Sequence, residues 1–162
     1  MEKKIIFENN YFKIFLYNNI VSIENLKGGA AILPVTKDKK VILLNIYRRA
    51  INQYSLEIPR GFSEDGEEPI NNAKREMQEE ISCVSENIIP LGYMHVDSGL
   101  MNSKVNLFLG LDTIIENSMV QEEEGIKNIV LYDFDIVYKM ALEGQINDSF
   151  TLAAILRSKR FM

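Results

Sequence analysis

The sequence predicts an α+β fold in which a mixed β-sheet lies between helices. Strand-like apolar segments come before and after one long amphipathic segment, and two further helical segments close the chain, an order typical of α+β domains. The chain has 162 residues, which is enough for one domain with a substantial core. Its 46% hydrophobic and 25% charged residues are the ordinary balance of a globular protein.

The N-terminal segment is expected to form antiparallel strands. Apolar and polar residues alternate between residues 4 and 26, and the pairs Asn9-Asn10 and Asn18-Asn19 interrupt them. Asparagine tolerates positive φ and marks tight turns, so two or three short strands are predicted. We expect residues 1–27 to belong to the same unit as the main domain, residues 28–162. Sheet packing is their expected role, and contact in a homodimer is the alternative.

Two apolar strands are predicted after the glycine pair that begins at Gly28, at residues 30–35 and 41–47, across the turn at residues 37–40. The second strand ends in Arg48-Arg49. Because guanidinium forks match the geometry of phosphate and carboxylate groups, this pair is a candidate anion site. A solvated strand edge explains the pair equally well.

The segment Ser55–Gly61 is predicted to be a short strand that runs into a loop. Pro59 and Gly61 favour an irregular backbone path there. A backbone carbonyl freed from the sheet at this point can ligate a metal ion.

The next segment is predicted to be a helix that begins near Pro69, a residue favoured in a first turn. At 3.6 residues per turn its apolar residues form one stripe, made of Ile70, Ala73, Met77, Ile81 and Val84. Glu76, Glu79 and Glu80 share a second stripe beside the first. We therefore expect one face of the helix to be buried while the neighbouring face presents three carboxylates to a cleft.

These three glutamates are candidate metal ligands. Like charges at this spacing destabilise a helix by about 0.2–0.5 kcal/mol per pair, and a cation offsets that repulsion. Hard oxygen ligands suit Mg²⁺ or Mn²⁺ rather than zinc. A solvated acidic face is the ordinary alternative, but no lysine or arginine follows any of the three by four residues. Glu67, eight residues before Arg75, invites an ion pair between loop and helix.

Residues 88–96 and 105–111 are predicted to form an antiparallel pair joined by a polar loop. His95 lies beside this loop, and we expect it to be exposed or hydrogen-bonded rather than a general base. The single cysteine, Cys83, rules out a disulfide framework in this chain and is expected to be a small buried residue at the helix end.

A second acidic cluster, Gln121–Gly125, precedes a strand predicted at residues 126–132. It is either a solvated loop or a loop from which one glutamate reaches the metal site as a ligand or general base. Asp133 is expected to cap a helix that ends near Leu142, and Asp148 to cap the last helix.

The net charge of −5 argues against a protein that binds nucleic-acid backbones, since such proteins need a basic face. The same charge is consistent with a cleft that attracts divalent cations. No segment is long and apolar enough to span a membrane, so no membrane partner is expected. A cytoplasmic protein is the expected default.

The acidic helix and the loop before it resemble the signature of the Nudix hydrolase family. That signature reads Gly, any five, Glu, any seven, Arg-Glu, an aliphatic residue, any one, Glu-Glu, any one, Gly and an aliphatic residue. At those spacings this chain has Gly61, Glu67, Arg75, Glu76, Met77, Glu79 and Glu80. So many fixed positions in one stretch make the signal specific. The chain departs at Ser82 and Cys83, and a serine in place of the glycine is expected to cost about 1 kcal/mol at a helix end with positive φ.

From Gly28 onward the chain is similar to the ADP-ribose pyrophosphatase-like branch of this family, through Tyr47-Arg48-Arg49, Ser55–Gly61 and Thr151-Leu152-Ala153-Ala154. The resemblance implies a Nudix fold, which is an α/β/α sandwich. It also implies metal-dependent hydrolysis of the diphosphate bond in a nucleoside diphosphate linked to another group, with ADP-ribose or an ADP-sugar as the leading substrate. The alternatives are other nucleotide sugars or dinucleotides, and a non-catalytic Nudix-fold nucleotide sensor.

The resemblance implies roles for the matching residues. Glu76 and Glu80 would be the core ligands of Mg²⁺, or of Mn²⁺, and Glu79 a further ligand or a water-orienting group. The backbone carbonyl of Arg60 would be another ligand, and Arg75 would orient the glutamates.

The remaining roles that the resemblance implies concern catalysis and substrate binding. Glu67 would support Arg75 through an ion pair, and Glu124 aligns best with the family's catalytic glutamate, with Glu122 next. The residues expected to contact the substrate are Arg48, Arg49, Glu57 and Ser98.

Overall fold

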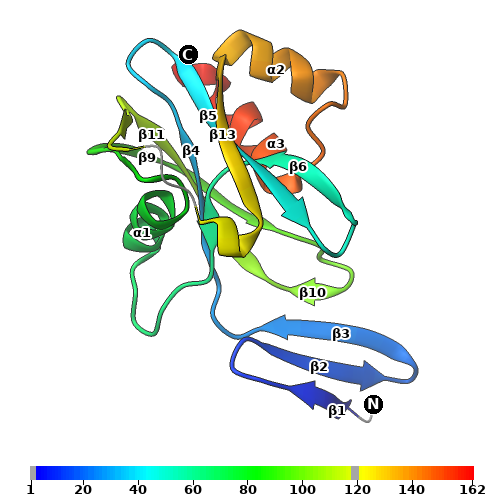
Figure 1. Cartoon of the computed structure of the whole chain (residues 1–162). Coiled ribbons are helices and arrows are strands. Elements are labelled where there is room, and N and C mark those ends of the chain that lie inside the picture. The colour runs from blue at the N-terminus through cyan, green and yellow to red at the C-terminus, as the bar shows by residue number, and fades with distance from the viewer. Residues whose placement is uncertain (1–2, 118–120) are drawn as a thin grey trace.

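The computed structural model describes residues 3–117 and 121–162, which form a layered body with a small sheet projecting from it (Figure 1). In chain order the strands are β1 (Lys3–Glu8), β2 (Phe12–Tyr17), β3 (Ile20–Asn25), β4 (Ala30–Pro34), β5 (Lys40–Arg48), β6 (Gln53–Glu57), β7 (Arg60–Gly61), β8 (Cys83–Val84), β9 (Asn87–His95), β10 (Met101–Asn102), β11 (Lys104–Leu111), β12 (Ile114–Ile115) and β13 (Ile126–Asp133). The helices are α1 (Pro69–Ile81), α2 (Phe134–Leu142) and α3 (Ser149–Ser158), with 3₁₀ turns η1 (Glu122–Glu124) and η2 (Lys159–Phe161).

Two sheets make up the middle layer of the body. One has the order β7-β4-β11-β9 and is mixed, because β4 runs parallel to β11 while the other pairs are antiparallel. The other has the order β13-β5-β6 and is antiparallel. The strands expected on either side of the turn at 37–40 therefore exist, but they lie in different sheets. Between them the described residues show one bridge, which joins Val35 and Val41.

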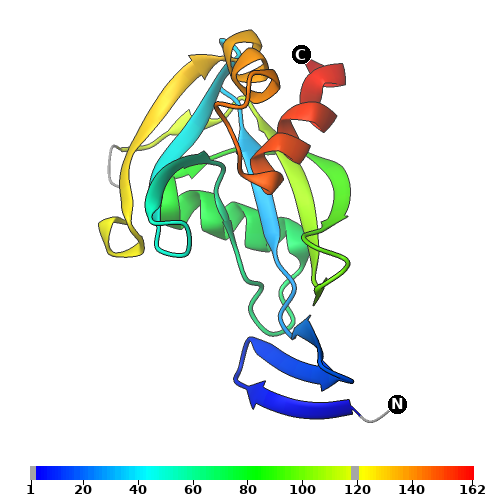
Figure 2. The same ribbon diagram turned by 90° about the vertical axis from the view of Figure 1, so that its right-hand side faces the viewer.

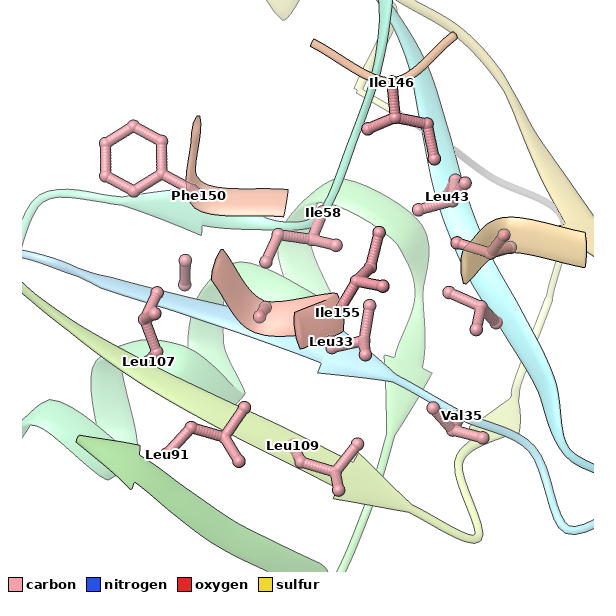
Figure 3. Close-up of a cluster of buried hydrophobic side chains, with 14 of the residues drawn as sticks. Leu33, Val35, Leu43, Ile58, Leu91, Leu107, Leu109, Ile146, Phe150 and Ile155 are labelled. Atoms are coloured by element: carbon pink, nitrogen blue, oxygen red, sulfur yellow. The ribbon is translucent and has the colours of Figure 1, made fainter. Parts of the chain in front are cut away.

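Side chains that alternate along the central strands divide the core into two halves. Leu33 of β4 belongs to a cluster with Phe150 and Ile155 of α3 (Figure 3). Ile32, its neighbour along β4, belongs to the opposite cluster with Met77 of α1. Helices thus cover both sides of the sheet layer, and the predicted α/β/α arrangement is confirmed.

The helix α1 begins at Pro69, as predicted, and ends at Ile81. The middle of the predicted apolar stripe is buried, at Ala73, Met77 and Ile81. The stripe is shorter than predicted at both ends, because Ile70 is 39% exposed and Val84 lies in β8. The buried stripe fixes the rotation of α1, and this rotation decides where the neighbouring glutamates point.

Ser82 ends α1 in the left-handed conformation, with φ 50° and ψ 42°. Its N–H donates to the carbonyl of Gln78 at 3.0 Å, which closes the last turn. The positive φ expected at this position is confirmed, and a serine adopts it where the family signature has glycine. Cys83 follows in β8 and is buried, as predicted.

The first three strands form a separate antiparallel sheet, which projects from the body (Figure 2). Asn18 and Asn19 have φ values of 45° and 71° in the turn between β2 and β3, as the asparagine pair predicts. The short strand β10 adds to this sheet by running parallel to β3, a pairing that the sequence did not indicate. Through β10 the loop between β9 and β11 joins the small sheet to the body.

The two C-terminal helices begin at the predicted aspartates. Asp148 accepts a hydrogen bond from the N–H of Thr151 at 2.9 Å and so caps α3. Asp133 stands at the N-terminus of α2 but makes no side-chain cap bond. Among the described residues, none of the helices has the length and apolar character needed to cross a membrane.

Candidate active site

A cleft of about 880 Å³ opens between the N-terminal sheet, the loop before α1 and the central strands. Phe62 of that loop packs against Tyr11 and Phe12 of the small sheet, with ring centroids 5.1 and 5.5 Å apart. Lys27 forms an ion pair with Asp65 across the same seam. The cleft therefore has an aromatic wall to which the small sheet and the loop before α1 both contribute. Its charged wall comes from the body and contains Arg48, Arg60, Arg75, Glu76, Glu79 and Glu124.

Glu76 and Glu80 lie one turn apart on α1, where they are only 8% and 2% exposed. Burial raises the pKa of Glu80 to about 8, and the charge of Glu76 adds to the effect. Burial also raises the pKa of Glu76, although Arg75 opposes it. The backbone N–H of Arg60 donates to Oε2 of Glu80 at 3.1 Å. A bound cation would stabilise the ionised form of these two buried carboxyl groups, whose pKa values are raised.

The carboxylate of Glu76 fills the space beside Gly61. A methyl group at Gly61 would place its carbon 2.1 Å from Oε1 of Glu76, which is far inside van der Waals contact. Asn72, one turn earlier on α1, donates to the same Oε1 at 3.3 Å and to the carbonyl of Phe62 at 3.1 Å. Gly61 and Asn72 together hold this carboxylate against the loop.

Arg75 links the acidic residues of the loop and the helix. Its Nε lies 3.0 Å from Glu67, and its Nη1 lies 2.9 Å from both Glu76 and Glu79. A hydrogen bond from Arg75 lowers the pKa of Glu67. The hydrogen bonds with Glu67 and Glu79 and the charge of Glu76 raise the pKa of Arg75 itself. The ion pair between Glu67 and Arg75 that the spacing predicted is present, and Arg75 holds the loop 61–68 against α1.

The donor chemistry of this site fits a hard divalent cation, since its side-chain donors are carboxylate oxygens. In residues 3–117 and 121–162, no three His, Cys, Asp or Glu side chains converge on one point. Because Nη1 of Arg75 bridges Glu76 and Glu79, these groups would have to rotate for the glutamates to share a cation. Glu76 and Glu80 would then be its central ligands, and the Arg60 carbonyl as a further ligand stays a prediction.

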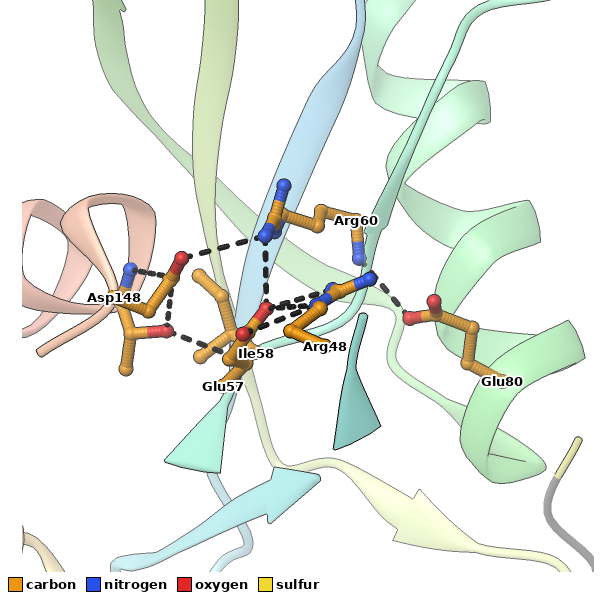
Figure 4. Close-up of polar contacts among 7 residues, drawn as sticks. Arg48, Glu57, Ile58, Arg60, Glu80 and Asp148 are labelled. Atoms are coloured by element: carbon orange, nitrogen blue, oxygen red, sulfur yellow. Dashed lines mark hydrogen bonds and ion pairs between the residues drawn. The ribbon is translucent and has the colours of Figure 1, made fainter. Parts of the chain in front are cut away.

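A second charged network lies on the other side of the Arg60 backbone (Figure 4). Glu57 is 2% exposed and accepts hydrogen bonds from Arg48 and Arg60, with Nη2 to Oε2 distances of 2.6 and 2.8 Å. Burial would raise the pKa of Glu57, but the two arginines outweigh it and hold this pKa below its usual value. The guanidinium of Arg60 also lies 3.4 Å from Asp148 and 4.3 Å from the ring centre of Phe150. The arginines are thus fixed by carboxylates at the edge of the cleft.

Of the other predicted site residues, some line the cleft and some lie outside it. Glu124 lines the cleft from η1, and its charge helps to raise the pKa values of the buried glutamates on α1. Arg49 is exposed at the end of β5, outside the residues that line the cleft. Ser98 lies beside a separate cavity of about 270 Å³, together with His95, which is exposed. Glu122 opens η1, and its side chain lies outside the described part of the structure.

Three contributions to the site were not recognised in the sequence. Asn72 stands four residues before Glu76, so helical periodicity could have identified it as a neighbour of that carboxylate. The side chain of Arg60 joins the site, whereas the family resemblance implies a role only for its backbone carbonyl. For Asp148 and Thr151 the sequence indicates only a helix cap and a family motif, because nothing local indicates that α3 begins beside Arg60.

Comparisons with known proteins give the family and several similar proteins. A model of the NUDIX domain matches residues 26–140. The chain is 25% identical to the ADP-ribose pyrophosphatase of Bacillus subtilis (strain 168), over 96% of this chain and 91% of the relative. It is 27% identical to the methanol dehydrogenase activator of Bacillus methanolicus, over 79% of this chain and 70% of the relative. A crystal structure of an ADP compounds hydrolase matches its fold with a TM-score of 0.81 and 16% identity, over 99% of this chain and 91% of the other.

Proposed function

Because this chain belongs to the NUDIX domain family, we propose that it hydrolyses the diphosphate bond of ADP-ribose or an ADP-sugar, with Mg²⁺ or Mn²⁺ as cofactor. The family match and the curated pyrophosphatase identify it as a Nudix pyrophosphohydrolase of the ADP-ribose pyrophosphatase-like kind. The observation that carries the proposal is the pair of buried carboxyls, Glu76 and Glu80, beside a cleft that two carboxylate-anchored arginines line.

The proposed reaction adds water to one phosphorus atom of the diphosphate and breaks the bridging P–O bond. The bridging oxygen leaves with the other phosphoryl group, so ADP-ribose gives AMP and ribose 5-phosphate. A divalent cation at such a site supplies positive charge to the phosphoryl oxygens and lowers the pKa of water.

The residues of the chain supply the binding and proton-transfer parts of this chemistry. Arg48 offers a guanidinium to the phosphoryl oxygens at the cleft edge. Glu124, exposed on the cleft wall, is the proposed base that accepts a proton from the attacking water, and Glu79 is proposed to orient that water. Arg75 balances the charge of the acidic cluster and keeps its glutamates in place.

A substrate panel tests this function. The protein is incubated with ADP-ribose, an ADP-sugar, a UDP-sugar and a dinucleotide, each with Mg²⁺, with Mn²⁺ and with EDTA, and the products are separated by chromatography. We expect AMP and ribose 5-phosphate from ADP-ribose in either metal, and no product in EDTA. Binding of these compounds without cleavage in either metal would favour the non-catalytic sensor instead, which the retention of Glu76, Glu79 and Glu80 argues against.

We also propose that the chain forms a homodimer through its N-terminal sheet. Every residue of β1 is exposed, and Ile5, Ile6 and Phe7 are each 50% exposed. Apolar residues gathered on an outer strand are typical of an interface that a partner covers. Light scattering on purified protein should give twice the mass of 18.6 kDa for one chain, and a monomer across micromolar concentrations would contradict the proposal.

A further inference from the structure

We propose that the side chain of Arg60 binds a phosphoryl group of the substrate together with Arg48, and that Asp148, at the start of α3, is the positioning residue that aims it. This inference rests on the proposed function, because it names groups that would hold the diphosphate of that substrate. It assigns to Arg60 a role for its guanidinium, in addition to the role expected of its backbone.

The guanidinium groups of Arg48 and Arg60 bind buried carboxylates on one side and face the cleft on the other. Their carboxylate partners are nearly buried, with side-chain exposures of 3% for Glu57 and 8% for Asp148. The arginine side chains are 32% and 26% exposed, for Arg48 and Arg60 respectively, and both line the cleft. Both guanidinium groups are therefore accessible to an anionic ligand in the cleft.

Each arginine has N–H groups that its carboxylate partners do not use. Arg48 uses Nε and Nη2 on Glu57, and Arg60 uses Nη2 on Glu57 and Asp148. Within the described residues, neither Nη1 group donates a hydrogen bond, although a guanidinium has five N–H donors. Oε2 of Glu57 accepts hydrogen bonds from the Nη2 groups of both arginines, so the two guanidinium groups lie side by side. Paired forks suit the several oxygens of a diphosphate.

The start of α3 fixes Arg60 through a chain of contacts. Asp148 Oδ1 lies 3.4 Å from Nη2 of Arg60, and its Oδ2 accepts from both the N–H and the hydroxyl of Thr151. The hydroxyl of Thr151 in turn accepts from the N–H of Ile58 at 3.1 Å (Figure 4). The face of the Arg60 guanidinium rests on Phe150, the second residue of the helix. The guanidinium is therefore held in one orientation before substrate arrives, which lowers the entropic cost of binding.

Three variants distinguish a binding role of the Arg60 guanidinium from a general effect on the stability of the fold. Arg60→Met keeps a long stem and leaves the backbone contact with Glu80 available. Asp148→Asn keeps an efficient N-cap but removes the charge that faces Arg60. Asp133→Asn is the matched control, because Asp133 is an exposed aspartate at the N-terminus of α2 with no cap bond. Binding of ADP-ribose and of inorganic pyrophosphate is measured by calorimetry on the full chain in EDTA, and KM and kcat are measured with Mg²⁺.

We expect Arg60→Met to weaken binding of both probes at least about tenfold, as the loss of a charge-assisted hydrogen bond should. Asp148→Asn should weaken binding about three- to tenfold, while Asp133→Asn stays within about twofold. KM for ADP-ribose should rise by similar factors with kcat changed by less than about threefold, a separation that general loosening of the fold would not give.

The inference is overturned if Arg60→Met binds as wild type does, if wild type binds neither probe, or if Asp148→Asn lowers kcat and leaves KM unchanged. Should Asp148→Asn fail to fold, the binding measurements on Arg60→Met still test whether the Arg60 guanidinium binds the phosphoryl group. Failure of the proposed function would look different. It would appear as absent cleavage by wild type in both metals, whatever the binding measurements in EDTA give.

Discussion

At Gly61 the missing side chain sets the position of a carboxylate on another element. The Glu76 carboxylate lies where a β-carbon would be, and its oxygens are 2.1 and 2.3 Å from that point. The space is therefore part of the proposed metal site, and a glycine is required for packing rather than for an unusual φ. The contact lies where the loop meets α1, so a change here should affect chemistry more than folding.

Gly61→Ala should displace Glu76 and reduce kcat/KM for the diphosphate substrate by roughly 10²–10³-fold, the range expected for losing one preorganised electrostatic contact. Gly99→Ala is the control, since a methyl group there meets only Asp97, at 3.4 Å. Steady-state kinetics and circular dichroism on both variants check this. Equal activity of the two variants would show that Glu76 does not need its present position.

Glu80 should make the metal-free protein less stable as pH rises. The folded state holds its proton up to a pKa of about 8, whereas the unfolded chain releases it near 4.5. Between these values the folded state binds more protons, so the free energy of unfolding falls with rising pH and levels off above pH 8. Urea titrations in EDTA at pH 5 to 8 should show this loss for wild type.

Glu80→Gln removes the titrating group, so its stability relative to wild type should increase across the same pH range. Glu86→Gln is the matched control, because the Glu86 side chain is 98% exposed. It should follow the pH dependence of wild type. Parallel curves for wild type and Glu80→Gln would mean that the pKa of Glu80 is not raised in the folded state.

The N-terminus of α3 shows how an element far along the chain fixes a segment of the candidate active site, the connection between β6 and β7. Thr151 is fully buried, and its hydroxyl donates to Asp148 at 2.7 Å while accepting from the N–H of Ile58 at 3.1 Å. The segment that carries Glu57 and Arg60 is therefore tied to a helix nearly a hundred residues later. Stability and substrate binding should both depend on this tie.

Thr151→Val keeps the shape of the side chain but leaves the buried N–H of Ile58 without its acceptor. We expect it to lower the free energy of unfolding by about 1–3 kcal/mol, measured by urea titration. Thr151→Ser retains the hydroxyl and should lose less, about 1 kcal/mol for the deleted methyl group. If serine destabilises as much as valine, packing rather than the hydrogen bonds holds this junction.

The elements that the sequence predicts well are those whose cause is local. The helix α1 follows from Pro69 and the spacing of its apolar residues, and its ion pair with Glu67 follows from the same spacing. The pairing of β4 with β11 and that of β5 with β13 do not follow, because both partners lie far along the chain. The parallel pairing of β10 with β3 and the approach of Asp148 to Arg60 are missed for the same reason.

Ligand binding should be visible in the stability of the whole molecule, because a cation that binds the folded state shifts the unfolding equilibrium. A Mg²⁺ concentration of about 100 times the Kd would stabilise the fold by about 2.7 kcal/mol, or roughly 5–10 °C in Tm for a domain of this size. Scanning calorimetry with Mg²⁺ and with sodium at equal ionic strength checks this. A Tm that responds only to ionic strength would argue against a specific cation site.

The proposed function assigns the central role to the buried carboxyls beside the cleft, so its most direct test is kcat/KM for ADP-ribose with Mg²⁺ in wild type and Glu80→Gln. We predict cleavage to AMP and ribose 5-phosphate by wild type. For the variant we predict a loss on the order of 10³-fold, with its fold preserved by circular dichroism. Equal rates for the two proteins would contradict the proposed metal site, and absence of cleavage by wild type with either Mg²⁺ or Mn²⁺ would contradict the proposed reaction.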